Sequence, residues 1–141
     1  MSAAIELGQV LAATPEARPL WDGLGEGELR LQRCGHCERL RFPPVASCPY
    51  CGTPGGEWEP VEPRGRLYSW VVTHVAFDES LADQVPYTVA TVQLDGGPRI
   101  FARLTDVDPA AIEAEMALEG YFHAEEGLPY LRFRPAARAD G

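Results

Sequence analysis

Lysine is absent from the sequence: all twelve basic residues are arginine, and 21 acidic residues bring the formal net charge to −9 at pH 7. Affinity for a polyanion comes mainly from cationic side chains that neutralise phosphates, so this charge balance argues against nucleic acid as a partner. Six arginines nevertheless gather in one part of the chain, at Arg30, Arg33, Arg39, Arg41, Arg64 and Arg66. They form either ordinary solvated surface or a contact for an acidic partner or for coenzyme phosphates, which guanidinium groups bind in a forked geometry.

A long hydrophobic run is also missing, because no stretch approaches the roughly 20 apolar residues that a membrane-spanning helix requires. Residues 1–6 contain neither the basic region nor the long apolar region of a secretory signal peptide. We therefore expect a cytoplasmic protein with no membrane partner. Structural disulfides are rare in that compartment, which bears on how the cysteines are interpreted.

Cysteine is scarce and confined to one segment. The only four cysteines form two Cys-x-x-Cys pairs, Cys34 with Cys37 and Cys48 with Cys51, separated by ten residues. Two such turns facing each other place four sulfur atoms in the tetrahedral arrangement that Zn²⁺ prefers, so we favour a zinc ribbon over a rubredoxin-like iron centre or two disulfides. A closed Cys₄ shell has no open position for water or substrate, and the metal is expected to be structural. Gly52 after the second pair suits a left-handed backbone better than Glu38 after the first.

Catalytic motifs are not recognisable either. His36, His74 and His123 are scattered, and none lies in a known nucleophile or metal motif. With all cysteines assigned to a metal, no thiol remains as a nucleophile. We expect no catalytic residue on this chain.

The chain is expected to be mainly β and to have three sections, namely an N-terminal helical segment over residues 1–27, a zinc ribbon over 28–58 and an OB-fold domain over 59–141. A short helix is predicted from Pro15 to Leu24, with Thr14 as its N-cap. Its apolar stripe of Leu20, Trp21 and Leu24 packs either against the ribbon or against another protein.

Alternating and β-branched segments predict the strands. One strand, 28–33, leads into the cysteine segment, and residues 54–63 are rich in proline and glycine and predict a connector. Five further strands are predicted at 66–77, 87–95, 99–105, 118–124 and 130–134, with a helical turn after Asp108. Three strands, a short helix and two strands are the element order of a five-stranded OB-fold barrel.

The combined pattern resembles a family in which a rubredoxin-like zinc ribbon is fused to an OB-fold, formerly catalogued as a domain of unknown function and associated with acyl-CoA metabolism. The resemblance covers roughly residues 15–136. The matching segments are 19–24, 29–37, 41–44, 48–52, 65–70, 86–87, 89–95 and 131–135. Members of this family are non-catalytic partners of thiolase-superfamily enzymes, and some are fused to, or encoded beside, enoyl-CoA hydratases.

The resemblance implies an accessory subunit that binds and stabilises a thiolase, an acyltransferase or an acyl-CoA retro-aldolase, including those of steroid side-chain degradation. We expect a heterotetramer, with an enoyl-CoA hydratase and an acyl-CoA as further contacts to be tested. The residues expected to contact the enzyme are Leu20, Trp21, Leu24, Arg39 and Arg41. Two alternatives stay open: a stand-alone acyl-CoA-binding protein and a nucleic-acid-binding OB module.

Overall fold

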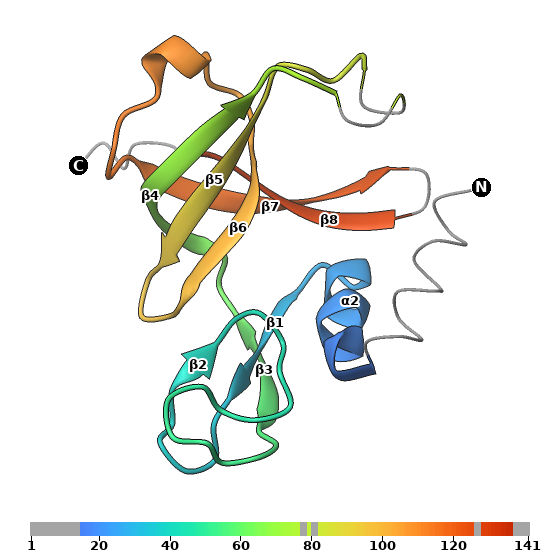
Figure 1. Ribbon diagram of the computed structural model, residues 1–141, viewed down its shortest axis with the longest axis vertical. Helices are drawn as coiled ribbons and strands as arrows, with labels where there is room; N and C mark the ends of the chain where they lie inside the picture. The colour runs from blue at the N-terminus through green and yellow to red at the C-terminus, as the bar shows by residue number, and fades with distance from the viewer. Residues whose placement is uncertain (1–14, 77–78, 80–81, 126–127, 137–141) are drawn as a thin grey trace. The chain divides into compact units, whose positions relative to one another are not determined.

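The computed structural model describes residues 15–76, 79, 82–125 and 128–136 of the chain. Backbone contacts divide the chain into two compact units (Figure 1). Unit 1 comprises Met1–Pro63 and Phe122–Leu131, and unit 2 comprises Arg64–Tyr121 and Arg132–Gly141. No helix in the described part of the chain is long and apolar enough to cross a bilayer.

A short helix precedes the first sheet, as the sequence predicts. It consists of a 3-10 turn, η1 (Pro15–Ala17), and an α-helix, α2 (Arg18–Gly25). The predicted N-cap, Thr14, lies outside the described residues, and the N-cap of α2 is Ala17, whose side chain makes no capping hydrogen bond. The helix ends where the backbone N–H groups of Glu26 and Glu28 both donate to the carbonyl oxygen of Gly23, at 2.9 and 2.8 Å.

The sheet of unit 1 has three antiparallel strands in the order β2-β1-β3. They are β1 (Leu29–Arg33), β2 (Leu40–Arg41) and β3 (Glu57–Val61). The connector predicted over residues 54–63 is therefore partly wrong, because five of its residues pair with β1. Pro60 is compatible with this strand because β3 lies at the edge of the sheet, where a missing N–H leaves no ladder bond unmade.

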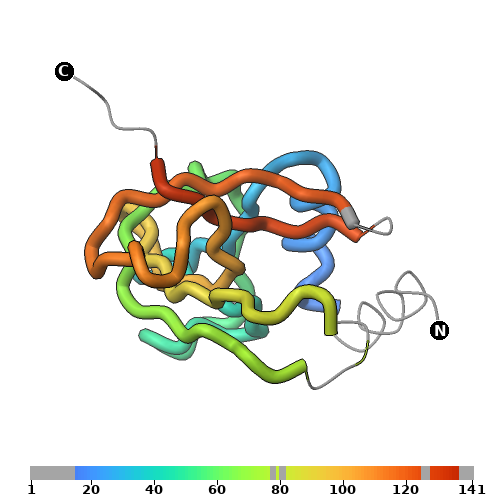
Figure 2. Tube along the Cα trace, turned by 90° about the horizontal axis from the view of Figure 1, so that it is seen from above, coloured from blue at the N-terminus to red at the C-terminus, as the bar shows by residue number. Residues whose placement is uncertain are grey.

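Five strands form a closed barrel in the order β4-β5-β6-β8-β7, which confirms the predicted OB-fold. Its strands are β4 (Arg64–Thr73), β5 (Tyr87–Leu94), β6 (Arg99–Leu104), β7 (Ala117–Glu125) and β8 (Leu128–Pro135). The barrel strands belong to unit 2 except for the parts of β7 and β8 within Phe122–Leu131. β6 pairs with β8 in parallel, and β7 runs beside β8 (Figure 2). The barrel interior is apolar and includes Leu67, Ala90, Val92, Leu118 and Phe133, each no more than 1% exposed.

One glycine is required for barrel closure. Gly65 lies opposite Leu94 of β5 and also opposite Leu118 of β7. A Cβ at this position would lie 2.1 Å from the carbonyl oxygen of Gln93, a backbone atom that cannot move aside. Only glycine therefore allows β4 to approach β5 this closely while it also pairs with β7.

The segment between β6 and β7 contains the helical turn predicted after Asp108. The Asp108 side chain caps it as expected by accepting a hydrogen bond from the Ala110 N–H at 2.9 Å. The 3-10 turn η3 (Pro109–Ala111) ends after three residues, because Ile112 has an extended backbone. Ile112 is 8% exposed, so its side chain is buried where the turn ends.

Candidate metal centre and interaction residues

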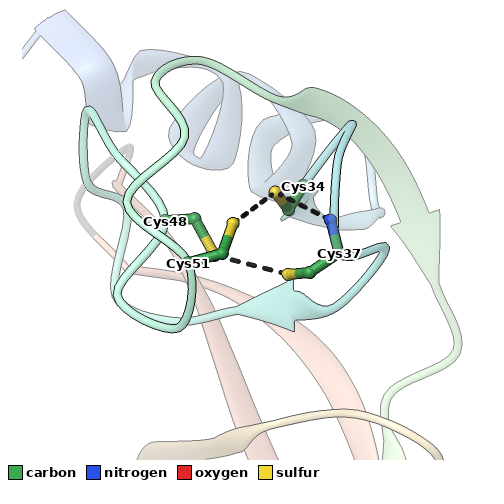
Figure 3. A group of neighbouring side chains, drawn as sticks. All are labelled: Cys34, Cys37, Cys48 and Cys51. Carbon is green, nitrogen blue, oxygen red and sulfur yellow. Dashed lines mark hydrogen bonds between the residues drawn. The ribbon is translucent and has the colours of Figure 1, made fainter.

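The four cysteine side chains converge on one point in unit 1 (Figure 3). All four Sγ atoms lie within 4.8 Å of one another. The Sγ atoms of Cys34 and Cys51 are 3.6 Å apart, and so are those of Cys37 and Cys48. A tetrahedron with metal–sulfur distances of about 2.3 Å has edges of about 3.8 Å, so the sulfur positions fit a Cys₄ metal site.

The two knuckles have the same backbone hydrogen bonds. In the first, the Glu38 N–H donates to the Cys34 carbonyl at 3.1 Å, and the Cys34 N–H donates to the Arg39 carbonyl at 3.0 Å. In the second, the Gly52 N–H donates to the Cys48 carbonyl at 2.8 Å, and the equivalent bond from Cys48 measures 2.9 Å. Each pair of cysteines is thus presented by a locally closed turn, which holds the sulfur atoms in place.

Backbone N–H groups also stabilise negative charge on sulfur. The N–H groups of His36 and Cys37 both lie 3.4 Å from the Cys34 Sγ. These donors, first Cys37 and then His36, lower the pKa of Cys34, because they favour its thiolate. Hydrogen bonds between Cys51 and the side chain and backbone of Thr53 likewise lower the pKa of Cys51 to about 6.

Cys37 differs from Cys34 and Cys51 in the direction of its pKa shift. The Arg39 backbone N–H lowers its pKa, but burial and the neighbouring sulfur atoms outweigh this effect and raise the pKa to about 11. Four thiolates packed together repel one another, and a divalent cation at their centre would remove that repulsion and hold all four deprotonated. The donor set is therefore soft, closed and suited to zinc or iron rather than to Mg²⁺ or Ca²⁺.

The histidines do not join this cluster. Among the described residues, the one group of metal-ligating side chains close enough to hold an ion consists of the four cysteines. His36 and His74 are exposed, and His123 is half-buried on β7. The imidazole groups of the three histidines therefore lie outside the cysteine site.

The two arginines predicted to contact a partner lie in opposite environments. Arg39 is exposed, and its guanidinium lies 4.8 Å from the ring centroid of Tyr50, which is 53% exposed. Arg41 is only 2% exposed, and its guanidinium donates to the side-chain oxygen of Gln32 at 3.2 Å. The prediction of Arg41 as a surface contact is therefore wrong, whereas Arg39 stays a prediction.

Arg41 instead organises the loop around the cysteines. Its Nη2 atom donates to the carbonyl oxygens of Val45, at 3.2 Å, and Gly55, at 2.5 Å. The oxygen of Gln32 that accepts from Arg41 also accepts from the Val45 N–H at 3.0 Å. A buried arginine thus satisfies carbonyl groups on both sides of the second knuckle, a role that its position in a two-residue strand did not reveal.

The apolar stripe on α2 is only partly covered. Leu20, Trp21 and Leu24 are all half-buried, and α2 packs against β1 within unit 1. The stripe has a packing role and an accessible part, so its contact with a partner stays a prediction. Val71 on β4 and Arg99 and Arg103 on β6 were not among the contact residues predicted from the sequence. The alternation of residues along the predicted strands is the signal that could have identified them as outward-facing.

Comparisons with known proteins match two consecutive parts of the chain to two domain models of the same family. Residues 21–56 match the model of the ChsH2 rubredoxin-like zinc ribbon domain, and residues 58–123 match that of the ChsH2 C-terminal OB-fold domain. A solved chain described as "Ltp2-ChsH2(DUF35) aldolase" superposes with a TM-score of 0.77 at 30% identity, covering 86% of this chain and 95% of the other.

Three curated relatives extend this comparison. A "DUF35 domain-containing scaffold protein" of Methanothermobacter thermautotrophicus is 35% identical over 67% of this chain and 73% of its own length. The benzoylsuccinyl-CoA thiolase subunit BbsA of Thauera aromatica is 27% identical over 75% of this chain and 74% of its own length. A probable enoyl-CoA hydratase alpha subunit of Thermomonospora curvata is 37% identical over 77% of this chain. The chain spans only 34% of the length of that hydratase subunit.

Proposed function

Because the chain belongs to the ChsH2 family, in which a rubredoxin-like zinc ribbon is joined to an OB-fold, we propose that it is a non-catalytic accessory subunit of a thiolase-superfamily enzyme. The observation that carries the proposal is the match of both domains to a family whose relatives are named as a scaffold protein, a thiolase subunit and part of an aldolase. The subunit binds and stabilises the enzyme, and the catalytic residues lie on the enzyme.

The cysteine site has a structural role in this proposal. Cys34, Cys37, Cys48 and Cys51 would hold one Zn²⁺, which would cross-link the two knuckles and contribute on the order of 10 kcal/mol to folding. Four protein ligands complete a tetrahedral shell, so the metal site would not bind substrate. The ribbon sheet alone has few buried apolar residues, chiefly Leu29 and Leu31, and depends on such a cross-link.

The proposed context is acyl-CoA metabolism in the cytoplasm. Two relatives are named as subunits of an enoyl-CoA hydratase and of a benzoylsuccinyl-CoA thiolase, which supports the link to acyl-CoA. Steroid side-chain degradation is a narrower proposal that rests on the sequence resemblance. We further propose a heterotetramer with two copies of each subunit, because a symmetric enzyme dimer presents each docking patch twice. We also propose that an enoyl-CoA hydratase binds to the same assembly and that the chain contacts acyl-CoA there.

Co-expression with a thiolase-superfamily enzyme of the same organism tests the proposal. We expect one co-eluting species in size-exclusion chromatography, a higher melting temperature of the enzyme in the complex, and no thiolase, aldolase or hydratase activity in the isolated chain. Separate elution at micromolar concentration, with the enzyme soluble and fully active alone, would contradict an accessory role. Titration of the isolated chain with acyl-CoA then decides whether it is a stand-alone binding protein.

A further inference from the structure

We propose that the enzyme subunit docks on the outer surface of β4, β5 and β6. The enzyme surface that covers it is apolar at its centre and has carboxylates at its edge. We call the outer surface of the three strands the β4–β6 face. Its principal residues are Tyr68, Val71, Thr91, Arg99, Phe101 and Arg103. The inference rests on the proposed function and adds to it the site and the chemistry of the contact.

The strand register places all of these side chains except Tyr68 on one side of the sheet. Tyr68 lies at a register shift of β4, and its ring contact with Arg99 assigns it to the same side. Along β5, the residues Thr88, Ala90, Val92 and Leu94 are buried, so the residues between them point out of the barrel. Thr91 lies opposite Phe101 of β6 and opposite Ser69 of β4. Val89 likewise lies opposite Arg103 and Val71. The outward positions of the three strands therefore form one continuous surface.

The β4–β6 face carries several large apolar side chains that are exposed to solvent. Phe101 is 62% exposed, Val71 is 63% exposed and Tyr68 is 49% exposed. A single exposed apolar residue is ordinary, whereas several on one strand face indicate a surface that a partner covers. Aromatic residues flanked by short side chains are also the kind of anchor that dominates protein–protein binding.

The charge of the three strands differs from that of the whole chain. β4, β5 and β6 contain four arginines and no aspartate or glutamate, although the chain carries a net charge of −9. The guanidinium of Arg99 lies 3.6 Å from the Tyr68 ring centroid, and Arg99 Nε donates to Gln93 at 3.2 Å. Such fixed cations favour a partner surface that brings carboxylates to the edge of an apolar centre.

The same features fit single-stranded nucleic acid less well. OB-folds that bind oligonucleotides stack bases on exposed rings of this face and neutralise several phosphates. Here the arginines already occupy one side of two rings, since Arg103 lies 4.3 Å from the Tyr87 ring centroid as Arg99 does above Tyr68. Acidic residues dominate the chain and repel a long polyanion, so a protein partner is favoured.

The test titrates the purified full chain into its purified thiolase-superfamily enzyme and measures the dissociation constant of the complex. We expect Phe101→Ala to raise the Kd at least about 30-fold, as for a central aromatic anchor. Phe122→Ala is the control, because Phe122 is an exposed aromatic residue on β7, outside the face. We expect this control to change the Kd less than about 3-fold. Circular dichroism of both variants verifies that the barrel is folded.

A second pair of variants tests the charge. Arg99→Gln should weaken binding and reduce its dependence on salt concentration, since a contact with a carboxylate is lost. Arg134→Gln is the matched control, because Arg134 lies 4.8 Å from the Tyr121 ring centroid and pairs with Glu119 at 3.1 Å on strands outside the face. We expect the control to leave the salt dependence unchanged.

The outcomes separate this inference from the proposed function. If the unaltered chain forms the complex and Phe101→Ala binds as tightly as the control, the face is overturned and the accessory role stands. If the unaltered chain forms no complex, both fall together. Binding of a fluorescent oligo(dT) that is steeply salt-dependent and lost in Phe101→Ala would also overturn the inference, in favour of nucleic acid.

Discussion

Glu38 and Gly52 occupy equivalent positions in the two cysteine knuckles and share a left-handed backbone conformation, with φ of 64° and 80°. Each follows the second cysteine of its pair and donates its N–H to the carbonyl of the first. A residue with a Cβ adopts this conformation at a cost of about 1–2 kcal/mol, whereas glycine adopts it freely. The two knuckles thus have the same shape, and only the first carries backbone strain.

Glu38→Gly should therefore stabilise the protein by about 1 kcal/mol, and Gly52→Ala should destabilise it by about the same amount. Chemical denaturation of the metal-loaded protein measures both changes. Gly35→Ala is the control, because Gly35 has no positive φ and a Cβ there would meet no atom within 4 Å. A loss of stability in Glu38→Gly would contradict the account of strain.

The cysteine site should contain close to one equivalent of zinc by elemental analysis of the purified protein. Cys48→Ser should lose the metal and much of its solubility, because the thiolate ligands contribute folding energy and Cys48 is 3% exposed. Ser47→Ala, at an exposed neighbouring residue, should retain the metal. An iron–thiolate absorption spectrum of native material, or full zinc retention in Cys48→Ser, would show that the metal or the ligand set is wrong.

Arg41 and Arg39 should respond differently to the same substitution. Arg41→Ala leaves the carbonyl oxygens of Val45 and Gly55 without their donor inside the ribbon, and we expect a loss of about 3 kcal/mol of stability. Arg39→Ala should cost less than about 1 kcal/mol, since its contact with Tyr50 is exposed. Thermal melting of the two variants compares them directly, and equal losses would contradict the assigned roles.

Residue alternation and the cysteine spacing predicted most of the fold. β5, for example, was expected over residues 87–95 and spans Tyr87–Leu94, because half of its residues are β-branched and buried positions alternate with half-buried ones. The cysteine site was predictable for a similar reason: two short motifs determine the positions of four sulfur atoms without reference to the remaining chain.

Features that depend on distant parts of the chain were not predictable. Burial of Arg41 requires acceptors from Gln32, Val45 and Gly55, which only the folded ribbon brings together. β3 was missed because Pro60 suggests a connector until the strand is known to lie at an edge. In both cases the local sequence signal was ordinary, and a tertiary contact decided the outcome.

Trp21→Ala tests the contribution of α2 to the complex. Trp21 is half-buried, so the substitution removes both packing within unit 1 and a surface that a partner could cover. If Trp21 is an anchor, the Kd for the enzyme rises by about 30-fold, equivalent to about 2 kcal/mol, at a temperature well below the melting temperature of the variant.

Asp22→Ala is the control for this substitution, because Asp22 lies on the same helix and its pair with Arg18, 3.8 Å apart, is mostly exposed. It should change neither the melting temperature nor the Kd appreciably. A lower melting temperature of Trp21→Ala with an unchanged Kd would assign Trp21 to packing of the ribbon alone. The enzyme contact would then have to lie elsewhere, and the Phe101→Ala variant of the β4–β6 face would identify it.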